Sequence, residues 1–91
     1  MNKLNEYRNK IDLIDKELLR LLSDRLTIVK KVWEFKKENN LSALQSNRWN
    51  EVLESKKNIW KDLWLREEFV EIIWNNIHDE ALYIENNILW D

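Results

Sequence analysis

The sequence contains no cysteine, no glycine and no proline. Without cysteine, disulfide bonds and thiolate metal sites are excluded. Tight β-hairpins usually depend on glycine, so its absence disfavours a β-rich fold and favours helices joined by short polar connections. No stretch is apolar enough to span a membrane, and the first residues lack the apolar segment of a signal peptide. We therefore expect an all-α protein, cytoplasmic and without a membrane role.

The charge is nearly balanced, with 15 Lys and Arg against 17 Asp and Glu and a net charge of −2. This balance argues against binding to nucleic acid or to a membrane surface through net charge. The one histidine, His78, precedes Asp79 and Glu80, but consecutive helix residues point to different faces. We expect no metal site and no cofactor, and we interpret His78 as a surface or hydrogen-bonded side chain.

Apolar periodicity predicts three helices in one domain covering residues 1–91. The first runs from about residue 3 to 39 and stops at Asn39-Asn40, because asparagine tolerates a left-handed helix cap. The second covers roughly residues 47–61, and the third follows a break near residues 63–66. The third helix carries an apolar inner stripe with Glu85 beside it: Val70, Ile73, Trp74, Ile77, Ala81, Ile84 and Ile88.

The first helix would be about 55 Å long, which exceeds the dimensions of a compact domain of this size. Two shorter helices from the same chain cannot cover it. A second copy of the chain is the simplest cover, so the sequence predicts an intertwined homodimer.

The first helix carries charges on the line of residues that it should bury. Its positions alternate in steps of four and three, as the apolar seam of a packed helix does: Leu4, Arg8, Ile11, Asp15, Leu18, Leu22, Arg25, Val29, Val32 and Lys36. A buried cation needs an anion. Pairing with carboxylates of the protein is one explanation, but with Arg48 the cations outnumber the single seam acid. The other explanation is an anionic ligand.

The spacing of the cations limits how they can meet. Arg25 and Lys36 lie three turns apart on one face, about 16 Å along the axis, so their side chains can converge on a small molecule. Arg8 lies about 25 Å from Arg25 and can join them only from a partner chain. Two arginines suit bidentate binding of two carboxylates, and a lysine suits a contact with one oxygen.

Three motifs resemble those of the all-helical (AroQ-class) chorismate mutases, and together they cover nearly the whole chain. They are Arg8-x-x-Ile11-Asp12-x-Ile14-Asp15-x-x-Leu18-Leu19-x-Leu21-Leu22-x-x-Arg25 with Val29 and Lys36, then Arg48-x-x-Glu51-Val52-Leu53, and Ile77-His78-Asp79-Glu80-Ala81. The resemblance implies an intertwined dimer of three-helix chains with two equivalent sites. It also implies the Claisen rearrangement of chorismate to prephenate, an isomerase step of the shikimate pathway in aromatic amino-acid biosynthesis, without a cofactor.

The resemblance assigns a role to each cation. Arg25, and Arg8 from the other chain, would bind the two carboxylates of the substrate. Lys36 would contact the ether oxygen and a carboxylate, and Arg48 would order the pocket. This reaction needs a substrate held in its compact conformer and positive charge near the breaking ether bond.

Four pocket positions depart from the family pattern. Trp49 replaces the Glu or Gln that binds the ring hydroxyl, and Gln45 replaces an acidic residue. Ala81 replaces a serine that assists carboxylate binding. Glu85 replaces a glutamine that donates to the ether oxygen, so only a protonated Glu85 could donate.

These departures leave alternatives open. Trp49 can be a core residue or line the pocket, and isochorismate-pyruvate lyases of the same fold also have an apolar residue there. A mutase acting on the 4-amino analogue of chorismate is a third possibility. A non-catalytic dimeric helical interaction module would explain the periodicity but not the seam cations, and a family member that folds without acting is also conceivable.

Overall fold

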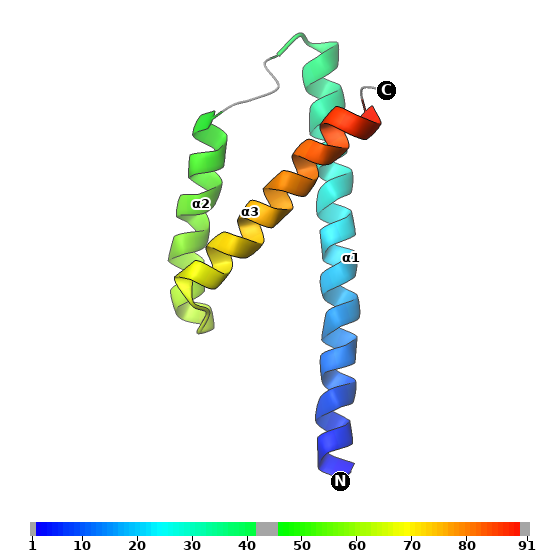
Figure 1. Ribbon diagram of the computed structural model, residues 1–91, viewed down its shortest axis with the longest axis vertical. Helices are drawn as coiled ribbons and strands as arrows, with labels where there is room; N and C mark the ends of the chain where they lie inside the picture. Colours follow the sequence, from blue (N-terminus) through cyan, green and yellow to red (C-terminus); the bar gives the residue numbers. More distant parts are fainter. Residues whose placement is uncertain (1, 42–45, 90–91) are drawn as a thin grey trace.

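The computed structural model describes residues 2–41 and 46–89, which contain helices and no strand (Figure 1). The predicted all-α class and the three predicted helices are confirmed within these ranges. The helices are α1 (Asn2–Glu38), α2 (Ser46–Trp60) and α3 (Glu67–Ile84), with a short 3₁₀ turn, η1 (Lys61–Leu63), before α3 and a π-helical turn, η2 (Glu85–Leu89), after it.

Helix α1 ends at the asparagine pair, as predicted. Asn40 adopts a left-handed conformation with φ of 55°. The backbone N–H of Leu41 donates to the carbonyl of Lys36 at 2.8 Å, and that of Asn40 donates to Lys37 at 3.4 Å. These two bonds form the pattern in which a left-handed residue closes the last helical turn.

The predicted break between the second and third helices is also confirmed. Trp64 adopts φ of 60° and is 97% exposed. Arg66 then takes an extended conformation before α3 and makes no side-chain capping bond. Glu67 and Glu68 place negative charge in the first turn of α3, where the helix dipole favours it.

Helix α3 packs across α2 and the C-terminal half of α1, so these three segments form the packed part of the chain (Figure 1). The predicted inner stripe of α3 lies at this contact. Val70 and Ala81 are buried, and the side chain of Ile88 lies outside those that the structure describes. The other stripe members are half-buried: Ile73, Trp74, Ile77 and Ile84.

The N-terminal part of α1 extends beyond the other two helices (Figure 1). The chain measures 58 × 28 × 16 Å, and its radius of gyration is 16.7 Å where a compact chain of this length has about 12 Å. Its accessible surface is 7736 Å², against about 5,700 Å² for a compact monomer of this mass. The chain therefore exposes roughly 2,000 Å² more than a compact monomer would.

Much of this additional surface is apolar, because the predicted seam of α1 is open. Leu4, Ile11 and Leu18 are all exposed. On the side of α1 that faces away from the seam, Arg20 forms local ion pairs with Glu17 and, at 2.8 Å, with Asp24. None of the helices in the described ranges combines the length and the apolar character needed to cross a bilayer.

Candidate functional site

All three helices contribute to one cavity of about 440 Å³, a volume that suits a small-molecule ligand. Its wall is mostly apolar and carries a few polar groups. The residues that line it are Arg25, Ile28, Val29, Val32, Trp33 and Lys36 of α1, Arg48, Trp49 and Val52 of α2, and His78, Ala81 and Leu82 of α3.

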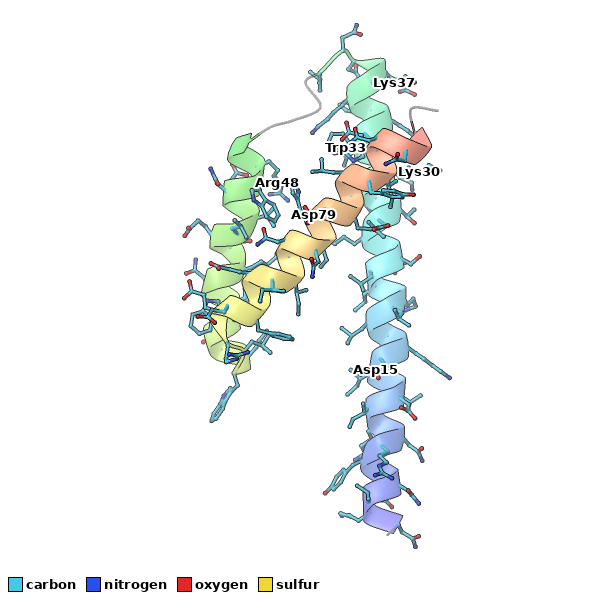
Figure 2. All side chains as sticks on the ribbon, viewed as in Figure 1. Asp15, Lys30, Trp33, Lys37, Arg48 and Asp79 are labelled. Carbon is cyan, nitrogen blue, oxygen red and sulfur yellow. The ribbon has the colours of Figure 1, made fainter. Side chains whose placement is uncertain are left out.

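Helical spacing explains why these residues meet. On α1 the lining positions recur in steps of three and four from Arg25 to Lys36, so they share one face. Arg48 and Val52 on α2, and His78 and Leu82 on α3, are likewise one turn apart. Figure 2 shows Arg48 on α2 and Trp33 on the upper part of α1, with α3 crossing between these helices. The cavity thus lies where α3 joins the other two.

The charges of the cavity are positive. Three lining residues are cations, namely Arg25, Lys36 and Arg48, and no carboxylate belongs to the lining among the residues described. Burial lowers the pKa of the Arg25 guanidinium, and the nearby charge of Arg48 lowers it further. In the part of the chain that the structure describes, Arg25 forms no ion pair. An anion between the two arginines would offset both the burial of the Arg25 charge and its repulsion by Arg48.

The other two cations have contacts within the protein. The Nζ atom of Lys36 lies 4.5 Å from the centroid of the Trp33 ring, within the range of a cation–π interaction. Arg48 lies 3.6 Å from a carboxylate oxygen of Glu51, but both side chains are largely exposed, so this pair is weak. The Glu51 carboxylate is not part of the cavity wall, and the wall keeps its positive charge.

Five of the predicted site residues line this cavity: Arg25, Lys36, Arg48, Trp49 and Ala81. Trp49 is half-buried with its ring at the wall, whereas the sequence left open whether it belonged to the core. Gln45 lies outside the described residues. That these residues bind a substrate stays a prediction.

Glu85 and Arg8 are not among the lining residues described. Glu85 is 5% exposed and begins η2, one turn after Ala81. Arg8 is exposed on the N-terminal half of α1, and so is Asp15, which Figure 2 shows on α1 well below the point where α3 crosses it. Neither Arg8 nor Asp15 forms an ion pair within the described ranges, so pairing between the seam charges does not explain Arg8 in the single chain.

Sequence reasoning did not place His78 in the cavity. Its imidazole stacks on the indole of Trp49, with 4.1 Å between ring centroids and 22° between ring planes. The sequence signal was its position three residues before Ala81 and four before Leu82, which puts all three on one helix face. In the described residues, no group of three His, Cys, Asp or Glu side chains could hold a metal ion.

Comparison with known proteins identifies relatives of the chain. The sequence profile described as "Chorismate mutase type II" matches residues 7–86. The chain is 33% identical, over 97% of its length, to a bifunctional chorismate mutase/prephenate dehydratase of Aquifex aeolicus. It is 27% identical, again over 97% of its length, to the protein of the same name in Buchnera aphidicola. It covers 25% and 23% of these two relatives, so it spans about a quarter of their length. No solved structure matches the chain.

Proposed function

Because the chain belongs to the type II chorismate mutase family, we propose that it converts chorismate to prephenate. The observation that carries the proposal is the set of three cations on the wall of an otherwise mostly apolar cavity. The half-buried Arg25 forms no ion pair among the described residues, and its charge is opposed by that of Arg48. A small dicarboxylate supplies the missing negative charge.

We further propose that two copies of the chain form an intertwined homodimer with two such sites. The roughly 2,000 Å² of additional exposed surface matches what each subunit buries in a large, permanent dimer. A partner chain seated on the open half of α1 would cover the exposed seam. It would also bring Arg8 of the partner subunit towards the cavity. Within a single chain, Arg8 is not among the described residues that line the cavity.

The proposed mechanism is electrostatic stabilisation combined with conformational restraint. Arg25 and Arg8 of the partner subunit hold the two carboxylates, which keeps the substrate in its compact, reactive conformer. Lys36 contacts a carboxylate and the ether oxygen, and Arg48 orders the pocket. As the C–O bond breaks and the new C–C bond forms, electron density grows on the ether oxygen, where the Lys36 ammonium stabilises it.

The rearrangement is intramolecular, so it needs no nucleophile, proton transfer or cofactor from the protein. Glu85 assists only if its carboxyl group is protonated, so that its O–H can donate a hydrogen bond to the ether oxygen. The mostly apolar wall of the cavity lowers the polarity around a bound substrate, and this strengthens each charge contact with it.

One observation favours a second candidate function. Trp49 lines the cavity at the position where the family usually has a Glu or Gln that binds the ring hydroxyl. An apolar residue at this position resembles that of the isochorismate-pyruvate lyases, whose substrate is a dianion of similar shape. Aminodeoxychorismate is a third dicarboxylate that the same cations could hold.

The test is to give the purified protein chorismate, isochorismate and aminodeoxychorismate separately. Prephenate, salicylate with pyruvate, and aminodeoxyprephenate are then followed as the respective products. We expect prephenate to form fastest. Salicylate and pyruvate as the main products would favour the lyase, and no turnover of any of the three would favour a non-catalytic helical interaction module.

A further inference from the structure

The cavity wall contains many hydrogen-bond donors and very few acceptors. Arginine, lysine and tryptophan side chains donate hydrogen bonds and have no acceptor atom. Four lining residues of these types can offer a donor to the cavity, namely Arg25, Lys36, Arg48 and Trp49, whereas the indole N–H of Trp33 is buried. Among the described lining residues, His78 is the one side chain that can accept a hydrogen bond, through the unprotonated nitrogen of its ring.

This imbalance matters for a ligand that carries a hydroxyl group. The carboxylates of such a ligand are acceptors, and the four donor residues suit them. A hydroxyl group must also donate its own proton, and a buried hydroxyl without an acceptor costs about as much as a lost hydrogen bond. The side-chain acceptor that the described wall offers is on His78.

The stacking contact fixes where that acceptor is. The imidazole lies nearly parallel to the Trp49 indole, with ring centroids 4.1 Å apart, so both ring nitrogens lie at the edge of the stack. His78 makes no hydrogen bond or ion pair within the described chain, which leaves the nitrogens available to a ligand. Its backbone position on α3, one turn before Ala81 and Leu82, holds the ring at the cavity wall.

We propose that His78 accepts a hydrogen bond from the ring hydroxyl of the substrate and so determines specificity, with Trp49 as the residue that positions the imidazole. This inference rests on the proposed function. It replaces an acceptor on α2 by one on α3, and it explains how a cavity with tryptophan at position 49 can still select a hydroxylated dicarboxylate. An ammonium group in place of the hydroxyl would add a fourth positive charge to the cavity. We therefore expect the amino analogue to bind more weakly.

The test measures binding by calorimetry, which does not depend on turnover. The two ligands are a bicyclic dicarboxylate that mimics the rearrangement transition state, with its ring hydroxyl, and the same compound without the hydroxyl. The proteins are the unmodified chain, His78→Phe and His78→Gln. Phenylalanine keeps a ring that can stack on Trp49 but has no acceptor, whereas glutamine restores an acceptor. Circular dichroism melting establishes that each variant folds.

We expect the unmodified protein to bind the hydroxylated compound about 3- to 10-fold more tightly than the deoxy compound, the value of one neutral hydrogen bond. His78→Phe should bind the two compounds equally, with unchanged affinity for the deoxy compound, and His78→Gln should regain part of the preference. A preference fully retained in His78→Phe would overturn the proposal. If the unmodified protein binds both compounds equally, the assignment of His78 fails and the dicarboxylate site stands. If it binds neither, the proposed function itself fails.

Discussion

Replacing Arg25 by methionine separates a ligand-binding cation from a structural one. Methionine keeps an unbranched apolar stem against the cavity wall and removes only the guanidinium group. A guanidinium that holds a substrate carboxylate makes two charge-assisted hydrogen bonds, each worth about 1.5–3 kcal/mol. Loss of both should lower kcat/KM by roughly 10²- to 10⁴-fold.

The stability of Arg25→Met, unlike its activity, should not fall. Both burial and the charge of Arg48 lower the pKa of Arg25, which means that the folded chain opposes its positive charge. No carboxylate of the described chain pairs with it. We therefore expect the free energy of unfolding of Arg25→Met to be unchanged or up to about 1 kcal/mol higher.

The matched control is Arg20→Met on the same helix, which removes the same charge outside the cavity. Arg20 is exposed and pairs with Glu17 and Asp24, contacts that contribute little to stability. We expect full activity in this control. Prephenate formation and urea unfolding of both variants provide the two readouts. The account is wrong if Arg25→Met keeps its activity, or if it loses more than about 1 kcal/mol of stability, as a cation paired inside the protein would.

Three further predictions concern other parts of the chain. Turnover of the unmodified protein should rise as pH falls, because only a protonated Glu85 can donate a hydrogen bond. Glu85→Gln should raise turnover at neutral pH and make it less dependent on pH, because an amide donates at any pH. The measurement is a pH-rate profile of each protein. Leu18→Glu should convert dimers to monomers in light scattering, since it places a charge on the open seam, whereas Lys16→Glu on the opposite face should not. Asn40→Ala should lower the free energy of urea unfolding by about 1 kcal/mol, because alanine tolerates the left-handed conformation poorly.

The helices could be predicted because each carries a local signal. The spacing of apolar residues marked α1 and α3, and Asn40 marked the end of α1. The positions of Arg25 and Lys36 on one face follow from helical geometry alone, and in the structure both residues line the same cavity. These features depend on residues close together in the sequence.

The features that the sequence could not supply depend on contacts between helices. Whether Trp49 faces the core or the cavity depends on how α2 packs against α3, and the stacking of His78 on it depends on the same contact. Glu85 is buried one turn after Ala81 but does not line the cavity among the described residues, and its burial likewise depends on how the end of α3 packs. Residue spacing along one helix does not determine such contacts.

The proposed role of Arg8 depends on a second chain. Arg8 is exposed and far from the cavity of its own chain, although the proposed mechanism requires it there. A site that needs Arg25 from one subunit and Arg8 from the other cannot work in a monomer. It also cannot work in a dimer of chains that all lack Arg8 or all lack Arg25.

The decisive measurement is therefore to mix Arg8→Met and Arg25→Met chains, unfold and refold them together, and assay prephenate formation. Random pairing makes half of the dimers mixed, and each mixed dimer has one site with both arginines. The account predicts that the mixture regains about a quarter of the activity of the unmodified protein, although each variant alone is inactive. A refolded mixture that contains mixed dimers and yet remains inactive would contradict a site shared between subunits.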